Sequence, residues 1–350
     1  MKLNLSPVLT TRNYGINSAQ VCDSIFCSKV SKFANVKVEN DCNFLQKTAK
    51  NSTFSCKIGE KFDEQLQNNA NIDLCFDIKK FTDKPLVLSF DFDASNATLV
   101  DKIGFYIAKG VEAKVILSFK SDVNAYHNGL VKFVCQEGSK LDVALVSDFK
   151  ECCTNVLRIE SELEASATLN VNVVDFGGKV DIQRYYCRLA GECAVSNLNC
   201  LYVAGGESFV DLNFEQDVFG QRCKADIQTI GALLGNARKH FKGTINFEKG
   251  CKKSVGCEDE LCLLLSKNAK SKALPMILCG EEDVDGKHSS SVGKVGENEL
   301  FYIMSRGLSQ EEALKLVVKA KFNILLEKIF DETLKEKLIE IVDRKLSDEN

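Results

Sequence analysis

Evenly spaced glycines punctuate the middle of the sequence and constrain its fold more than any other feature. They recur at nearly equal steps, at Gly177, Gly191, Gly205, Gly220, Gly235 and Gly250. Glycine turns at a fixed distance between short strands are the signature of a structural repeat. We therefore expect the units to stack on one another along the chain.

Apolar and polar residues alternate from about Pro85 to Met276, which is the period of strands with one buried and one wet face. In the run 162–173, alanine, leucine and valine point one way, while glutamate, serine, threonine and asparagine point the other. This run predicts a strand. We expect further strands at Val115–Phe119, Leu141–Val146, Phe209–Phe214 and Thr244–Phe247.

Hairpin turns are scarce among these strands. An antiparallel sandwich would also give short, regular strands. Yet the hairpin dipeptides Asn-Gly and Asp-Gly occur only at Asn128-Gly129 and Asp285-Gly286. The spacing therefore favours a solenoid with two glycine-bounded units per coil. We expect a mainly β protein with a right-handed β-helix-like core, a mixed N-terminal cap and a C-terminal α-helical segment.

The change of pattern along the chain predicts three regions. Residues 1–84 form the N-terminal cap, in which residues 16–35 suit a short helix and Leu74, Phe76 and Ile78 alternate like a strand. Residues 85–295 form the β-helix core. Residues 296–350 form the helical segment.

The helical segment carries clear boundary residues. Glu297–Arg306 predicts a short helix with Gly307 at its C-terminal end. Ser309 and Glu312 then form a capping box, and apolar residues follow at steps of three and four. A third helix is predicted over Asp331–Leu346. Two interpretations stay open for this segment: a cap over the open end of the solenoid, or a surface that docks a partner.

Composition excludes several classes. The chain has 350 residues, 45% of them apolar, and a net charge of -4, which does not suit a bulk nucleic-acid binder. No stretch approaches the roughly 18 to 20 apolar residues of a membrane helix, and the first thirty residues lack the layout of a signal peptide. We expect a cytoplasmic protein that binds neither nucleic acid nor membrane.

Sixteen cysteines are spread along the chain without any CxxC pair. A chain of this length without an export signal has little need of disulfides. We expect most of these cysteines to be buried as small apolar side chains. The number of thiols also suits soft-metal or iron–sulfur chemistry.

No nucleotide or hydrolase motif is present. Gly280–His288 (GEEDVDGKH) has five residues between its glycines where a phosphate loop has four, and a histidine where the magnesium-binding Ser or Thr should follow the lysine. We therefore expect no ATP site on this chain, and we expect it not to be an enzyme.

An ordered set of motifs runs through the C-terminal third. They are FKGTI (241–245), LLLS (263–266), Pro275, DVDGKHSSSVG (283–293) and ELFYIMSRGLSQEEA (299–313). This set closely resembles the C-terminal part of the SufB/SufD family, the scaffold subunits of the SUF iron–sulfur cluster assembly machine. The resemblance covers the stretch from Phe241 to the end of the sequence well.

Within that family the chain looks more like SufD than SufB. The SufD-like histidine is kept as His288, although Gly286 stands where the family has a cysteine. SufB usually carries acidic residues on both sides of this histidine, whereas Lys287 and Ser289 flank it here. At the position of a functional cysteine of SufB, an ungapped alignment places Glu260.

The resemblance implies a candidate site for a transient iron–sulfur cluster or for sulfur. Imidazole and thiolate are ligands that such clusters accept, so we name His288 as the metal ligand and Cys257 and Cys262 as further candidates. The alternatives are a histidine that only orders a loop and cysteines that are inert in the core. No motif reports a flavin.

The resemblance also implies partners. In the family the helical tail docks the SufC ATPase, and Phe301, Tyr302, Arg306 and Gly307 match its most recognisable stretch. Aromatic residues and arginine are also the usual anchors of interfaces. A second partner would be a SufB-like subunit or another copy of this chain, paired through the β-helix.

Two other functions stay open. A polysaccharide-acting enzyme on a right-handed β-helix is one, although the chain has no Trp and no export signal. The other is a relative that docks the SufC ATPase but lacks cluster chemistry, which Gly286 and Glu260 would explain.

Overall fold

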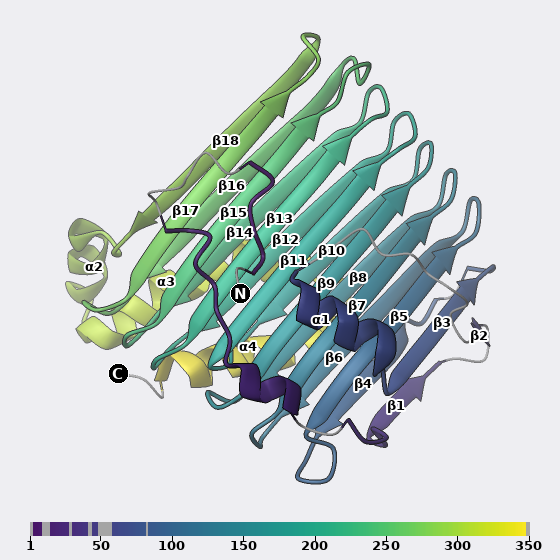
Figure 1. The fold of residues 1–350 in the computed structure, drawn as a ribbon. Helices are drawn as coiled ribbons and strands as arrows, with labels where there is room; N and C mark the ends of the chain where they lie inside the picture. Colours follow the sequence, from purple (N-terminus) through teal and green to yellow (C-terminus); the bar gives the residue numbers. More distant parts are fainter. Residues whose placement is uncertain are drawn as a thin grey trace.

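The computed structural model describes residues 3–8, 15–27, 30–40, 44–47, 58–81 and 83–347. In this part of the chain the strands form two nine-stranded sheets that face each other (Figure 1). Sheet A contains, in spatial order, β1 (Val36–Glu39), β4 (Leu86–Phe92), β6 (Glu112–Ser121), β8 (Lys140–Phe149), β10 (Thr168–Asp175), β12 (Val195–Ala204), β14 (Lys224–Leu233), β16 (Ser254–Leu264) and β18 (Val284–Gly293). Sheet B contains β17 (Lys270–Cys279), β15 (Arg238–Phe247), β13 (Phe209–Val218), β11 (Val180–Leu189), β9 (Thr154–Leu163), β7 (Tyr126–Cys135), β5 (Thr98–Ile107), β3 (Ile72–Ile78) and β2 (Phe44–Lys47).

From β3 onward, consecutive strands alternate between the two sheets, so each coil gives one strand to each sheet. Neighbouring strands are parallel and in register, except that β1 pairs antiparallel with β4 and β2 with β3. The step to the next coil is 29 residues from Val180 to Phe209 and from Phe209 to Arg238, but it is 26 from Thr154 to Val180 and 32 from Arg238 to Lys270. These steps are close to two of the glycine intervals. The predicted β-solenoid with two units per coil is confirmed.

The coil corners explain the glycine spacing. Left-handed backbone recurs once per coil at one corner, at Gly110, Gly138, Ser166, Cys193, Arg222 and Lys253. It recurs at another corner at Gly177, Gly206 and Gly235. Gly220 is needed for a different reason, since a Cβ there would lie 2.0 Å from the carbonyl oxygen of Gly191 on the previous coil. The feature that recurs from coil to coil is thus the left-handed corner, and glycine occupies only some of these corners.

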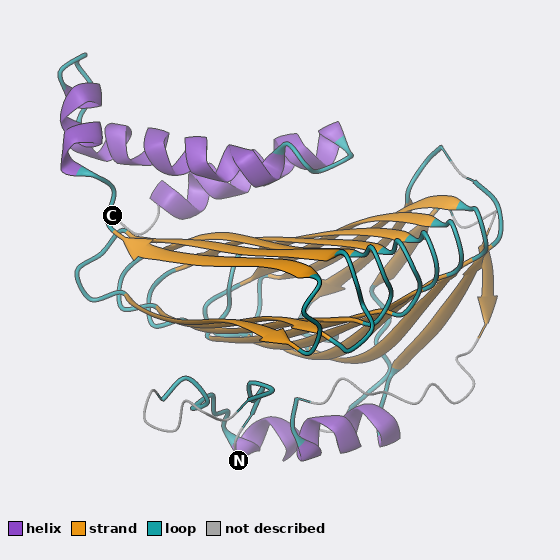
Figure 2. Cartoon of the chain, turned by 90° about the horizontal axis from the view of Figure 1, so that it is seen from above, coloured by secondary structure: helices purple, strands orange, loops and turns teal. Residues whose placement is uncertain are grey.

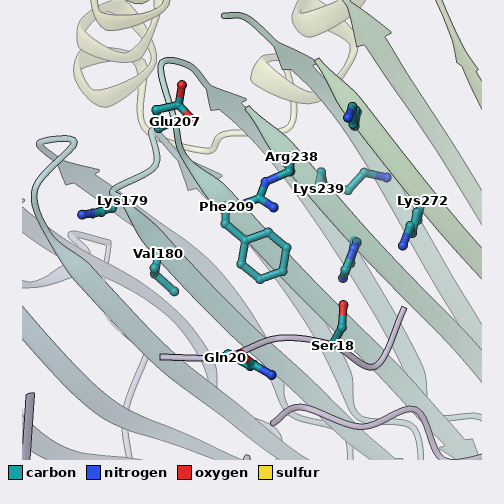
Figure 3. Close-up of a pocket in the computed structure, with 11 residues that line it drawn as sticks. Ser18, Gln20, Lys179, Val180, Glu207, Phe209, Arg238, Lys239 and Lys272 are labelled. Carbon is teal, nitrogen blue, oxygen red and sulfur yellow. The ribbon is translucent and has the colours of Figure 1, made fainter. Parts of the chain in front are cut away.

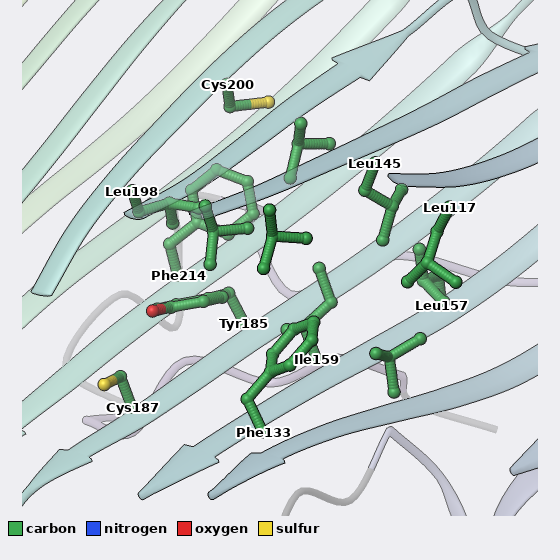
Figure 4. Close-up of a cluster of buried hydrophobic side chains, with 14 of the residues drawn as sticks. Leu117, Phe133, Leu145, Leu157, Ile159, Tyr185, Cys187, Leu198, Cys200 and Phe214 are labelled. Carbon is green, nitrogen blue, oxygen red and sulfur yellow. The ribbon is translucent and has the colours of Figure 1, made fainter. Parts of the chain in front are cut away.

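Apolar side chains fill the interior, by which we mean the space between the two sheets (Figure 4). Identical register places like residues on top of one another. Phe76, Phe105 and Phe133 on sheet B stack with ring centroids 5.3 and 5.4 Å apart. Stacked aromatic ladders of this kind add to the burial energy of each ring.

Some local predictions need correction. The run 162–173 is not one strand, because Ser166 takes a left-handed φ of 55° in the corner between β9 and β10. Among the described residues of 16–35, the helix is a five-residue 3-10 helix, η1 (Asp23–Cys27), while helix α1 (Glu60–Asn68) was not predicted. The strand expected around Phe76 is confirmed as β3.

The predicted C-terminal helices are present as α2 (Glu297–Met304), α3 (Gln310–Leu326) and α4 (Glu332–Ser347). The capping box of Ser309 and Glu312 is confirmed at the start of α3. Gly307 follows α2 with φ +99°, although the helix ends at Met304, earlier than expected. Among the described helices, none is both long and apolar enough to cross a bilayer.

The helices cover the outer faces of the sheets (Figure 2). α3 and α4 pack their apolar sides against the outer face of sheet A, on residues such as Val174, Leu201 and Ile230. α1 and the N-terminal segment lie on the outer face of sheet B. The interpretation of the C-terminal helices as a cap over the open end is therefore wrong, because their apolar faces are used along the side of the solenoid.

The described cysteines are all free thiols. Buried ones are Cys135, Cys153, Cys187, Cys200, Cys223, Cys251 and Cys262. Exposed ones are Cys22, Cys152, Cys193, Cys257 and Cys279, while Cys75 is half-buried. The side chains of Cys27, Cys42 and Cys56 lie outside the described set. Burial as small apolar residues thus accounts for seven of these thiols. Of the two candidate ligands, Cys262 is buried and Cys257 is exposed.

Candidate functional site

β16 and β18 bring the predicted site residues to the last coil. The two strands are parallel and in register, with His288 beside Glu258 and Val292 beside Cys262. Partners in a parallel register share a face. Cys262 and Glu258 are buried on the interior face, so His288 belongs to that face too, at the open end of the solenoid. His288 itself is exposed, since no further coil covers β18.

Cys257 lies on the other side of the sheet. Its position and that of Cys262 differ by an odd number, and side chains alternate along a strand. Cys257 lines a polar outer groove of about 540 Å³ together with Asp226, Asp259 and Lys328. The structure therefore places His288 and Cys262 on one face, but four residues apart in the strand register, and it places Cys257 on the other face.

The chemistry of Cys257 follows from its neighbours. Partial burial raises the pKa of its thiol, and the carboxylates of Asp226 and Asp259 raise it further. The protonated thiol is a weak nucleophile and a poor metal ligand. The protonated form of Cys257 is therefore favoured at neutral pH.

A buried ion pair stands behind the open end. The ammonium of Lys239 on β15 contacts Glu260 Oε1 on β16, and both side chains have no exposed surface. Burial lowers the pKa of Lys239 to about 8, while the thiols of Cys262 and Cys200 favour its charged form. Ser290 on β18 donates its hydroxyl to Glu260 Oε2 at 2.7 Å. This contact joins the ion pair to the strand that carries His288.

Glu258 is a second buried carboxyl group on β16, and it also faces the interior near the open end. Neither of its oxygens has a hydrogen-bonding side chain among the described residues, and a Cβ on Gly243 of the facing sheet would lie 2.0 Å from Oε1. Burial raises its pKa to about 8, with Asp259 adding to the shift and a backbone hydrogen bond from Met276 opposing it. The protonated form is therefore favoured at neutral pH.

Polar side chains continue along the interior of sheet B. His127 Nε2 lies 2.6 Å from Asp101 Oδ1, and its Nδ1 lies 2.7 Å from Asn155 Oδ1. Asn155 donates to Asp181 at 3.1 Å. Burial raises the pKa of both Asp181 and its neighbour Asp175, and their mutual repulsion raises that of Asp175 further. The interior is thus not purely apolar.

Gly286 occupies the position at which the SufD-like pattern has cysteine. A Cβ there would lie 3.0 Å from Cγ2 of Ile277 and 3.1 Å from a ring carbon of Phe247. These contacts are tighter than ordinary van der Waals contact, so a thiol at this position would require its neighbours to move. The local packing is built for glycine.

The residues carried over for docking lie on α2 and just beyond it. Phe301 and Tyr302 are 74% and 59% exposed, and α2 buries none of its side chains. The guanidinium of Arg306 lies 4.7 Å from the centre of the Tyr302 ring and also donates to its hydroxyl. Both aromatic side chains are therefore exposed to solvent, and Arg306 contacts Tyr302.

Comparison with known proteins agrees with this architecture. The family model described as "SUF system FeS cluster assembly, SufBD core domain" matches residues 90–321, which include most of the solenoid, α2 and most of α3. The chain belongs to the SufBD family.

Several members of the SufBD family are similar to this chain. An iron–sulfur cluster assembly SufBD family protein of Mycobacterium tuberculosis is 26% identical over 204 residues, 57% of this chain and 24% of that protein. SufD of Bacillus subtilis is 29% identical over 158 residues, 45% of this chain and 36% of SufD. SufB of the same organism is 22% identical over 198 residues, 56% of this chain and 42% of SufB. The chain thus spans about a quarter of the mycobacterial relative and less than half of the other two.

The charged interior of this SufBD protein was only partly visible in its sequence. Glu260 stood out as a departure from SufB, whereas Lys239 and Glu258 were missed. Residues 254–260 contain too few apolar residues to show which side chains face inward. Glu260 lies beside Thr229, which in turn lies beside Cys200, so the three residues form one row across the sheet. The pairing between coils shows this, and the pattern within one strand does not.

Removing one partner of the buried ion pair should destabilise the protein. We expect Lys239→Met to lower the free energy of unfolding by about 3–5 kcal/mol, because Glu260 is left charged without compensation. Urea denaturation measures this change. The matched double variant Lys239→Met/Glu260→Met should recover most of the loss. A single variant within about 1 kcal/mol of wild type would contradict a charged pair in the interior.

Glu258 should make stability fall as pH rises. Its pKa is raised from 4.5 to about 8 in the folded protein, so between these values the folded state holds a proton that the unfolded chain has released. Stability from this proton is complete below pH 4.5 and is lost as pH rises through 8. We expect Glu258→Gln to gain on the order of 3 kcal/mol over wild type between pH 5 and pH 9.

Thermal or urea unfolding at several pH values tests this expectation. The exposed Glu112→Gln serves as a control with the same change of side chain. A difference between wild type and Glu258→Gln that does not vary with pH would show that Glu258 is not protonated in the fold.

Proposed function

We propose that the chain is a non-catalytic, SufD-like scaffold subunit of iron–sulfur cluster assembly that works with a SufC-type ATPase. The observation that carries the proposal is the match of the SufBD core model across both the solenoid and the docking helix, residues 90–321. In this proposal the charged interior belongs to the end that holds the cargo, and the exposed aromatic side chains of α2 form the partner surface.

The docking step is supported by α2. An exposed phenylalanine and tyrosine next to a fixed arginine have the composition of an interface hot spot. Gly307, with its left-handed φ, turns the chain from α2 into α3. α3 and α4 are tied to sheet A by apolar packing, so α2 has a firm base from which to present Phe301 and Tyr302.

Loss of the aromatic pair should strongly weaken the complex with the ATPase. We expect Phe301→Ala/Tyr302→Ala to weaken binding by roughly 30-fold or more, because even one hot-spot residue of the two would contribute about 2 kcal/mol. Size exclusion with light scattering, followed by titration, measures this on full-length protein. The matched control is Leu316→Ala/Ile324→Ala, two half-exposed apolar residues of α3.

Two results would count against docking through α2. One is a folded full-length protein that does not bind its organism's SufC-type ATPase. The other is equal weakening by the α2 pair and the α3 pair, which would place the contact elsewhere.

In this proposal the iron–sulfur cluster is cargo that binds at the open end of the solenoid. Among the described residues, no three His, Cys, Asp or Glu side chains are grouped so as to hold a metal ion. His288 and Cys262 share a face and give two ligand types that clusters accept. A transient cluster here therefore requires ligands from a second chain. β17 and β18 each end their sheet with one unpaired edge, which suits pairing with a SufB-like subunit or a second copy.

The two faces of β16 allow a direct test of the ligands. After anaerobic incubation with iron and sulfide, we expect His288→Ala and Cys262→Ala to lose more than about half of the bound iron, because both act from the interior face. Cys257→Ala should retain it, since its thiol lies on the outer face. Iron and acid-labile sulfide are measured on the complex with its partners. Loss of iron only in Cys257→Ala would move the site to the outer groove.

A second candidate is a family member that docks the ATPase without holding a cluster. The tight packing around Gly286 favours it, because the position of the SufD-like cysteine is filled by Ile277 and Phe247. A complex with the ATPase that remains free of iron after reconstitution would select this candidate.

A further inference from the structure

A basic pocket opens on the outer face of sheet B, far in sequence from the docking helix (Figure 3). It has a volume of about 470 Å³, within the range of pockets for small ligands. Its floor is formed by the first residues of four neighbouring strands, β11, β13, β15 and β17. The N-terminal segment closes one side through Ser18 and Gln20.

The register of the solenoid collects cations in this pocket. One outward-facing row runs from Phe209 to Arg238 and Lys270, and the next row holds His240 and Lys272. Lys179 lies at the rim, just before β11. Four cationic side chains thus face one carboxylate, that of Glu207. The ammonium of Lys239, which also borders the pocket, points into the interior toward Glu260.

Most of these charges are not used within the protein. In the described part of the chain, Lys179, Arg238 and Lys270 form no ion pair. Lys272 reaches only the carbonyl oxygen of Gly15, at 3.4 Å. Glu207 accepts a hydrogen bond from Asn236 at 2.5 Å. Uncompensated cations gathered in a concave site create a local positive potential that attracts anions.

The back of the pocket is held rigidly. His240 is 7% exposed, and its ring meets Phe209 edge-on at 5.0 Å, while Arg238 lies 5.8 Å from the centre of the Phe209 ring. Behind them Asp211 Oδ1 accepts hydrogen bonds from Lys242 and Asn4, each at 2.6 Å. His240 Nδ1 lies 3.6 Å from the other oxygen, Asp211 Oδ2, and makes no hydrogen bond with any described residue. The cationic side chains around the pocket, and not the His240 ring, are therefore what attracts an anion.

We infer that this pocket binds a small multivalent oxyanion, either a phosphate-bearing molecule or a polycarboxylate. Arginine and lysine form charge-assisted hydrogen bonds with both kinds of group. The pocket opens on the outer face of sheet B, whereas His288 lies on the interior face of sheet A, and the inference does not depend on the proposed function.

Calorimetric titration of the full chain with pyrophosphate, and separately with citrate, tests the inference at about 0.1 M salt and constant ionic strength. We expect saturable binding of at least one probe, weakened about tenfold or more by Arg238→Gln/Lys270→Gln. The stronger probe identifies the phosphate or the carboxylate source. The matched control, Lys249→Gln/Lys252→Gln, removes the same charge from exposed positions after β15 and should change binding less than about twofold.

Three results would overturn the inference. They are the absence of saturable binding by either probe, equal weakening by the two double variants, and binding of an acidic peptide alone. Circular dichroism of each variant shows that it is folded, so a loss of binding can be assigned to the pocket.

Discussion

In-register stacking of coils is the constraint on which the rest of this structure depends. Each strand is hydrogen-bonded to the equivalent strand of the next coil, so the parity of a residue decides whether its side chain faces the interior or the outside. A slip by one residue would exchange the two faces along a whole strand. Left-handed backbone recurs at the corners between these strands. The placement of Cys262 inside and Cys257 outside is a direct consequence of their parity.

The same constraint permits a charged interior. Burying Lys239 with Glu260 contributes little net stability, because desolvation offsets most of their attraction. Apolar residues of similar size would fill the space at no such cost. Glu258, without a side-chain partner among the described residues, is more costly still. Buried titratable groups with strongly shifted pKa values cluster more often at functional sites than in structural cores. The position of these groups next to His288 is consistent with a role in the chemistry of the open end.

The fold could be predicted from the sequence further than the site could. Alternation and glycine spacing predicted the solenoid because both are local consequences of strands and corners that recur in every coil. Helix α1 was missed, since its burial depends on a sheet face distant in sequence. The amphipathic pattern of α3 showed that one side is buried, but not against which surface. Residues 254–260 lack alternation, so the inward direction of Glu258 and Glu260 required the register. The pairing of Lys239 with Glu260 crosses between sheets, which no pattern within one strand reports.

The connection between β18 and α2 joins the two regions for which functions are proposed. β18 ends at Gly293 and α2 begins at Glu297, so only three residues link them. α3 and α4 are fixed to sheet A by apolar packing, and Lys328 at the end of α3 also binds Asn199 and Gln228 at 2.7 Å each. A partner that moves α2 would therefore transmit force to β18 more directly than to any other strand. β18 is the last strand of its sheet, is paired on one side only, and carries His288 and Ser290 at the open end. Force at the docking helix would thus be felt first where the cargo is proposed to sit.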